Sequence, residues 1–238
     1  TNTTNNNIRS HINNENISDD LKGKSVRGGI ITVLQHAGNF FLRIGSTAIL
    51  ARILTPEDFG LIAMVGTILG FVQMFKDAGL SMATIQKENI TFEQVSTLFW
   101  INLGISFILM IIVIALSPVI AWFYSEPKLI EITLAMSCIF IFGGLSIQHQ
   151  ALLRRQMKFG HLAIAELFSQ SVGIVVAIGA ALHGYEYWSL VFMAIVQSLV
   201  RMILIWFVSN WYPKLPKFKS DIKELLSFGG NLSLSRFL

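Results

Sequence analysis

The sequence is poor in cysteine and in charge. It has one cysteine, Cys138, which excludes an internal disulfide, and only 13% of its 238 residues are charged. Soluble domains carry about 25% charged residues. This deficit, together with 53% hydrophobic residues and a mean hydropathy of +0.60, excludes an ordinary soluble domain and indicates an integral membrane protein.

Several signatures of enzymes and exported proteins are missing from the sequence. No His/Cys cluster has metal-ligand spacing, and no Gly-rich loop is present that would hold a nucleotide phosphate. We therefore expect no metal, no cofactor and no direct ATP hydrolysis. The first residues, 1–20, are rich in Asn and Thr and lack the apolar core of a cleavable signal, so they predict a disordered tail. The absence of an initiator Met suggests a fragment or a processed chain.

Long apolar runs dominate the remainder. The length of each run is close to the roughly 20 residues that a helix needs to cross a bilayer. They predict an all-α, polytopic membrane helix bundle, with a six-helix lobe over residues 21–210. Residues 211–238 are expected to be a cytoplasmic linker and the start of a seventh helix. The six predicted spans are 29–54, 59–75, 95–122, 129–147, 162–182 and 189–208.

Short motifs precede some of these runs or lie within them. Thr55-Pro56-Glu57-Asp58 has an N-cap residue, a proline at the first helical position and acids in the first turn, so it predicts a helix start. Thr91-Phe92-Glu93-Gln94 is a capping box that predicts another. Gly66-x-x-x-Gly70 predicts close helix packing inside the second span.

Basic residues are distributed asymmetrically between the predicted loops. Thirteen of the 18 lysines and arginines fall on the side of the N-terminus, and two, Arg52 and Lys128, fall on the other. Basic loops remain in the cytoplasm, so we expect the cytoplasmic membrane and a cytoplasmic N-terminus. This topology accounts for the net charge of +4 without nucleic acid as a partner.

A polar stripe runs through the first span. Thr32, His36, Asn39, Arg43 and Ser46 recur at steps of four and three residues, which places them on one helical face. An arginine at the centre of a membrane helix costs roughly 2.5–3.5 kcal/mol. The stripe is therefore expected to line a polar cavity and bind substrate. The alternative for Arg43 is that it extends to the outer interface.

Other intramembrane polar residues extend this prediction. Arg201 with Gln197 on the same face, and Arg236 in the seventh helix, are predicted to line the cavity, although Arg201 could equally reach the cytoplasmic interface. Glu166 either pairs with an intramembrane arginine or binds a coupling proton or cation. Asp77, a second candidate for ion coupling, is more simply a cap or a partner for its neighbour Lys76.

Residues in and beside the fourth loop, between the predicted spans 129–147 and 162–182, have simpler predicted roles. His149 and His161 flank the basic segment of that loop and are expected to be solvated. Arg154, Arg155 and Lys158 are expected to set the topology and contact anionic membrane lipid, with a role in receiving a cargo headgroup as the alternative.

Several blocks of the sequence are specific enough to identify a family. The blocks are Ala51-Arg52-Ile53-Leu54-Thr55-Pro56-Glu57-Asp58-Phe59-Gly60, Phe75-x-Asp77-x-Gly79-Leu80-x-x-Ala83-x-Ile85-Gln86, Ser96-Thr97-Leu98-Phe99-Trp100-x-Asn102, Ala151-Leu152-Leu153-Arg154-Arg155 and Leu225-Leu226-Ser227-Phe228-Gly229-Gly230. They resemble the polysaccharide-exporting branch of the multidrug/oligosaccharidyl-lipid/polysaccharide flippase superfamily, from about residue 21 to the end.

The resemblance implies a flippase with two lobes of helices around a central cavity that opens alternately to each side. Its implied cargo is a polyprenyl-pyrophosphate-linked oligosaccharide for exopolysaccharide or lipopolysaccharide, and a polysaccharide polymerase is an implied partner. This chain would form the first lobe. The alternative within the superfamily is a cation-coupled exporter of small organic cations. A membrane enzyme is a third reading, but the sequence offers no catalytic residues for it.

Overall fold

The computed structural model describes residues 27–76, 84–85 and 90–216, and this part of the chain is helical, without strands. The first helix covers residues 27–50. The long helices that follow it in the chain are α2 (Pro56–Lys76), α4 (Phe92–Tyr124), α5 (Lys128–Arg155), α6 (Phe159–Leu182) and α7 (Trp188–Ser209). The predicted all-α fold is confirmed, and the helices overlap the six predicted spans. The predicted tail and the predicted seventh helix lie outside the described residues, whereas the linker is described as far as residue 216.

Within the described residues, five helices, α2 and α4 to α7, are long and apolar enough to cross a membrane. The chain is therefore a multi-pass membrane protein. The first helix is of similar length but is not among the five. The polar stripe lowers the apolar content of the first helix. Its crossing of the membrane therefore stays a prediction, which depends on the surface that the stripe faces.

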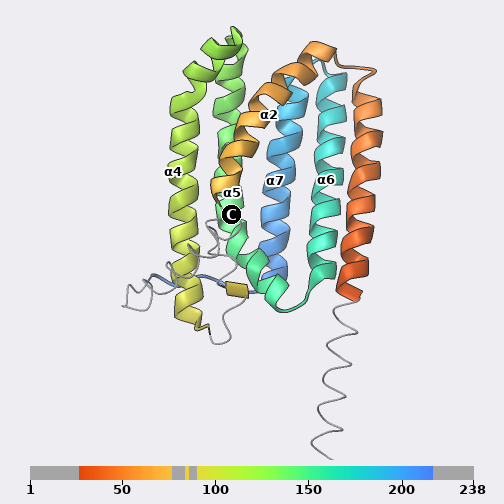
Figure 1. The fold of residues 1–238 in the computed structure, drawn as a ribbon. Coiled ribbons are helices and arrows are strands. Elements are labelled where there is room, and N and C mark those ends of the chain that lie inside the picture. The colour runs from red at the N-terminus through yellow and green to blue at the C-terminus, as the bar shows by residue number, and fades with distance from the viewer. Residues whose placement is uncertain (1–26, 77–83, 86–89, 217–238) are drawn as a thin grey trace, which may run out of the picture.

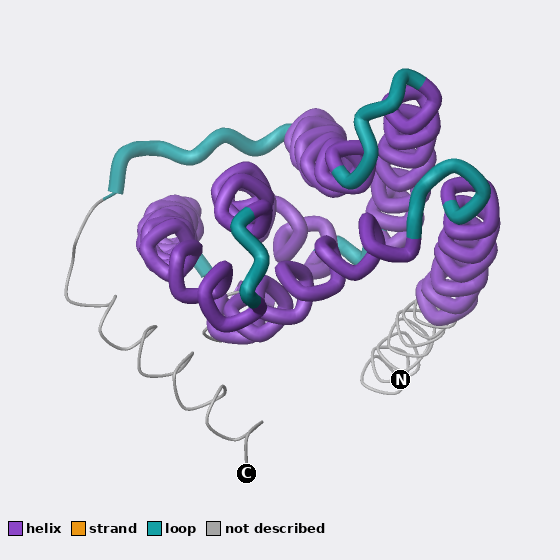
Figure 2. Tube along the Cα trace, turned by 90° about the horizontal axis from the view of Figure 1, so that it is seen from above, coloured by secondary structure: helices purple, strands orange, loops and turns teal. Residues whose placement is uncertain are grey.

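The described helices form two layers of near-antiparallel neighbours. Helix α4 packs along α5, α6 packs along α7, and α5 and α7 join the two pairs. The first helix stands beside α6 at the edge, while α2 starts near its far end and crosses obliquely in front of α5 and α7 (Figures 1 and 2). The first helix and α2 thus diverge toward the end of the bundle where α5 and α6 are joined.

Both predicted helix starts are confirmed. The Asp58 carboxylate accepts hydrogen bonds from the backbone N–H and the hydroxyl of Thr55, each at 2.8 Å, and so fixes the first turn of α2. Thr91 caps α4: its hydroxyl accepts from the Gln94 N–H at 3.3 Å, and the Gln94 side chain accepts from the Thr91 N–H at 3.0 Å. These caps satisfy donors that a helix terminus leaves free.

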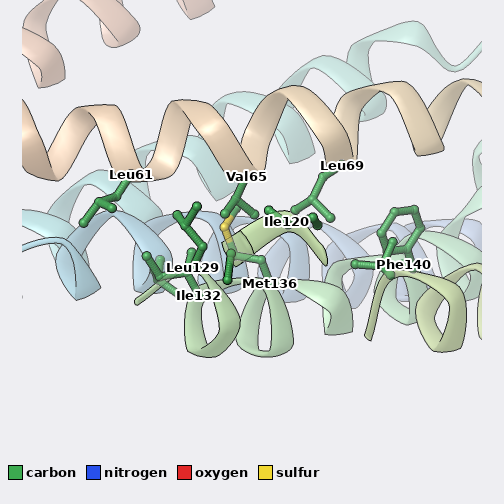
Figure 3. Packing of buried hydrophobic residues seen from close by; sticks show 11 residues of the cluster. Leu61, Val65, Leu69, Ile120, Leu129, Ile132, Met136 and Phe140 are labelled. Carbon is green, nitrogen blue, oxygen red and sulfur yellow. The ribbon is translucent and has the colours of Figure 1, made fainter. Parts of the chain in front are cut away.

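The largest buried apolar cluster joins α2 to α4 and α5. Leu61, Val65 and Leu69 form one face of α2, at steps of four residues, and they pack onto α5 residues such as Ile132 and Phe140 (Figure 3). This contact holds α2 in its oblique position, and that position sets the separation between α2 and the first helix.

Close helix approaches occur at glycines other than the predicted pair. Nothing described lies within 4 Å of a Cβ built on Gly66 or Gly70, so the prediction of close packing there is wrong for the described part of the chain. The buried face of α2 passes through Leu61, Val65 and Leu69, and the two glycines lie off this face. A Cβ on Gly173 of α6 would instead stand 2.9 Å from the Met193 carbonyl oxygen of α7.

We expect Gly173→Ala to destabilise the lobe, because the new methyl group would meet backbone that cannot rotate away. Overpacking costs about 1–3 kcal/mol. The matched control is Gly179→Ala in the same helix, where nothing lies within 4 Å and the higher helix propensity of Ala favours the variant. Thermal unfolding of the purified proteins in one detergent provides the comparison. An unchanged midpoint for Gly173→Ala would contradict the tight α6–α7 contact.

Candidate functional site

A cavity of about 650 Å³ lies between the first helix, α2, α6 and α7. On α2 it is lined by residues of the first two turns, Phe59, Ile62 and Ala63. We call it the Arg43 cavity. Its polar and titratable lining residues are His36, Asn39, Arg43, Ser46, Thr47, Glu166, Gln170 and Gln197, and its apolar wall includes Phe40, Phe59, Ile62, Ile174 and Met193.

Four of the five residues of the predicted stripe line this cavity, namely His36, Asn39, Arg43 and Ser46. Thr32 does not: it is one turn nearer the start of the helix, and its hydroxyl donates to the Gly28 carbonyl oxygen at 2.9 Å. The Ser46 hydroxyl likewise donates to the Arg43 carbonyl oxygen at 3.0 Å. Thr32 and Ser46 thus satisfy their hydroxyls within the helix.

Arg43 is the least constrained charge in the cavity. Its side chain is exposed, and it forms no ion pair or hydrogen bond with another side chain in the described part of the chain. A guanidinium stays protonated even when it is desolvated, and it binds carboxylate and phosphate through two parallel hydrogen bonds. Arg43 is therefore free to bind an anion that enters the cavity.

Asn39 lies where the first helix meets α6. The Gln170 amide donates to the Asn39 carbonyl oxygen at 3.4 Å. The Asn39 side-chain oxygen is buried and has no hydrogen-bond partner among the described residues. Leu167 of α6 fits against Gly38, where a Cβ would stand 2.9 Å from its Cδ2. These contacts hold the polar stripe against α6 and direct it into the cavity.

Glu166 is paired with Arg201. Its carboxylate lies 2.9 Å from Nε of the guanidinium, and Nη2 of Arg201 donates to the Gln150 side-chain oxygen at 3.1 Å. Glu166 was predicted either to pair with an intramembrane arginine or to bind a coupling proton or cation. The structure shows the ion pair. Because this carboxylate is neutralised, Arg43 dominates the charge of the cavity wall.

Gln197 also lines the Arg43 cavity, one helical turn before Arg201 on α7. Arg201 itself faces a second, smaller cavity beyond the ion pair. Arg236 and Asp77, the two remaining predicted site residues, lie outside the described residues, so their roles stay predictions.

Sequence reasoning placed His149 wrongly. It was expected to be solvated, yet it is fully buried and stacks on Trp206 with ring centroids 4.4 Å apart. The predicted fourth span ends at residue 147, whereas α5 continues to Arg155 and carries His149 into the bundle. Trp211 packs on the same ring from the segment after α7, with centroids 5.0 Å apart.

A buried amide pair was missed as well. The Asn102 amide donates to the Gln148 side-chain oxygen at 3.3 Å, and the Gln148 amide donates to the Thr84 hydroxyl. Arg155 donates to the Thr84 carbonyl oxygen at 2.8 Å. The available signal was an amide in each of two long apolar runs, which favours a polar contact between helices. These residues tie 84–85 to the ends of α4 and α5.

The chemistry of the cavity is that of a binding site. No group of three or more His, Cys, Asp or Glu side chains in residues 27–76, 84–85 and 90–216 is arranged to hold a metal ion. The lining combines a guanidinium that has no ion pair within the described residues, an imidazole and three side-chain amides with an apolar wall. Such a surface suits a ligand that carries both negative charge and hydroxyl groups.

Comparisons with known proteins identify the family of the chain. Residues 49–238 match the family model described as "Polysaccharide biosynthesis protein". The chain is 32% identical over 208 residues to the succinoglycan biosynthesis transport protein ExoT of Rhizobium meliloti, an alignment that covers 87% of this chain and 40% of ExoT. No solved structure matches the chain significantly.

Two further relatives come from distant bacteria. The teichuronic acid biosynthesis protein TuaB of Bacillus subtilis is 28% identical over 93% of this chain and 45% of its own length. The lipopolysaccharide biosynthesis protein WzxC of Escherichia coli is 24% identical over 90% of this chain and 44% of its own. The chain thus spans less than half the length of these relatives. It is a multi-pass membrane protein that belongs to the polysaccharide biosynthesis protein family.

Proposed function

We propose that the chain forms the first lobe of a flippase that moves polyprenyl-pyrophosphate-linked oligosaccharides across the cytoplasmic membrane. The observation that carries the proposal is the position of Arg43, a guanidinium without an ion pair in the described part of the chain, in a cavity of about 650 Å³ between the first helix, α2, α6 and α7. The relative ExoT, which is named as a transport protein, supports transport in place of catalysis.

The cavity matches the headgroup of such a cargo in chemistry. A pyrophosphate carries at least two negative charges, and a guanidinium binds phosphate oxygens in a bidentate manner. The amides of Asn39, Gln170 and Gln197 line the same space and offer donors and acceptors for sugar hydroxyls. The polyprenyl tail would remain in the lipid while the headgroup occupies the cavity.

Transport requires the cavity to open alternately to each side of the membrane. In the proposed whole protein, residues 21–210 are one lobe, residues 211–238 lead into a second, and rocking of the two lobes moves the headgroup outward. The cavity between the first helix and α2 would then face the second lobe. A polymerase that consumes the flipped oligosaccharide, or an ion gradient, would make transport unidirectional.

We expect Arg43→Gln to reduce flipping of the lipid-linked oligosaccharide by about 10- to 100-fold, the equivalent of one hydrogen-bonded charge interaction. The matched control is Arg52→Gln, which removes the same charge from an exposed turn outside the cavity. Accumulation of oligosaccharide on the cytoplasmic leaflet of cells with equal protein levels provides the measurement. Equal activity of the two variants would remove Arg43 from the mechanism.

The alternative cargo, a small organic cation, predicts the opposite preference. Exporters of cations need unpaired intramembrane carboxylates, whereas Glu166 is paired with Arg201. We expect a pyrophosphate-linked polyprenol to compete with labelled inorganic pyrophosphate for the purified protein, and a hydrophobic cation not to compete. Displacement by the cation alone would favour the alternative.

The proposed topology is testable through the single cysteine. In a Cys138→Ser background, a cysteine at Lys158 in the α5–α6 loop should be shielded from a membrane-impermeant maleimide added to intact cells. A cysteine at Glu126, in the α4–α5 turn, should be labelled. Labelling at residue 158 but not at residue 126 would reverse the assigned orientation.

A further inference from the structure

A second polar cavity, of about 290 Å³, lies between α2, α5 and α7. We call it the Arg154 cavity. Arg154 stands at the end of α5 and Arg201 on α7, so two guanidiniums from different helices line one small space. The polar lining residues are Gln73, Ser146, Gln150, Arg154, Ser198 and Arg201.

The ion pair of Arg201 separates this cavity from the Arg43 cavity. Glu166 lines the Arg43 cavity, and Arg201 lines the Arg154 cavity, with 2.9 Å between carboxylate and guanidinium. On the other side Arg201 donates to Gln150, a neutral partner at 3.1 Å. An anion in the Arg154 cavity could therefore replace the neutral Gln150 without leaving a charge unpaired, or compete with the Glu166 carboxylate for Arg201.

The two cavities lie at different depths. Arg201 is eight residues before the end of α7, which corresponds to about 12 Å at the helical rise of 1.5 Å per residue. Arg43 is sixteen residues after the described start of the first helix, about 24 Å by the same rise. Both helix ends lie at the end of the bundle that carries the α5–α6 loop (Figure 1). The backbones of Arg43 and Arg201 are thus roughly 12 Å apart in depth, and the two arginines line different cavities.

We propose that the Arg154 cavity is a second anion site, which receives the diphosphate of the cargo at the cytoplasmic end before the headgroup reaches Arg43. This inference rests on the proposed flippase function. Arg154 is exposed at the mouth of the cavity, while Arg201 lies deeper and is held by Glu166. A diphosphate that binds both arginines draws Arg201 from Glu166, and return of Arg201 to the carboxylate releases the headgroup inward.

The test uses the complete protein in nanodiscs of neutral phosphatidylcholine, titrated calorimetrically with inorganic pyrophosphate. The wild type should bind two pyrophosphates. Arg43→Gln and Arg154→Gln should each lose one binding event, with an affinity at the affected site at least about tenfold weaker. The matched control is Lys158→Gln, which removes an exposed charge from the neighbouring α5–α6 loop, outside the cavity, and should retain both events.

Other outcomes separate this inference from the proposed function. If Arg43→Gln abolishes all binding and Arg154→Gln matches Lys158→Gln, the second site is refuted and the flippase proposal stands. Absence of any pyrophosphate binding by the wild type contradicts both. If phosphatidylglycerol in the nanodiscs abolishes the event that depends on Arg154, the cavity serves anionic membrane lipid and the inference fails.

A second variant tests the exchange of partners and does not depend on the stability of Arg154→Gln. Glu166→Gln removes the carboxylate that competes for Arg201, so pyrophosphate should bind the Arg154 cavity about tenfold more tightly. The lipid-linked cargo should then be retained, and flipping should slow although binding improves. Unchanged or weaker pyrophosphate binding by Glu166→Gln would overturn the exchange.

Discussion

The polar face of the first helix constrains the arrangement of the helices around it. A guanidinium cannot face acyl chains without a cost of several kcal/mol, so Arg43 requires a polar or aqueous surface at the same depth. Helices α6 and α7 provide polar side chains for that surface, and α2 closes the cavity with an apolar wall. The oblique course of α2, fixed by its leucine and valine face on α5, keeps this cavity open.

The second intramembrane arginine is accommodated in a different way. Arg201 is held by Glu166 and Gln150, so its charge is compensated within the lobe. Among the described residues Arg43 thus has no charged partner, whereas Arg201 has one in Glu166. The small residues of α6 allow this arrangement, because Gly173 and Ala177 bring α7 close enough for residues 166 and 201 to meet.

Periodicity and capping chemistry made much of the fold predictable. Apolar runs located the helices, the threonine caps located the starts of α2 and α4, and the spacing of His36, Asn39 and Arg43 predicted that they share a cavity wall. These features depend on residues close together in the chain.

The predictions that failed concern contacts that depend on tertiary packing. Gly66 and Gly70 have a packing motif but lie off the buried face of α2, and His149 is buried because α5 extends past its apolar run and meets Trp206 and Trp211. Nor could spacing alone decide whether Glu166 pairs or binds an ion.

The central claim is that the polar face of the first helix lines an aqueous, anion-binding cavity. Its most direct test is the reactivity of single cysteines in a Cys138→Ser background toward a charged, water-soluble thiol reagent. A cysteine at His36, which lines the cavity, should react and be protected by pyrophosphate, whereas one at Phe41, exposed on the same helix but outside the cavity, should not react. A cysteine at position 36 that stays unreactive, or reacts equally with and without pyrophosphate, would contradict the account.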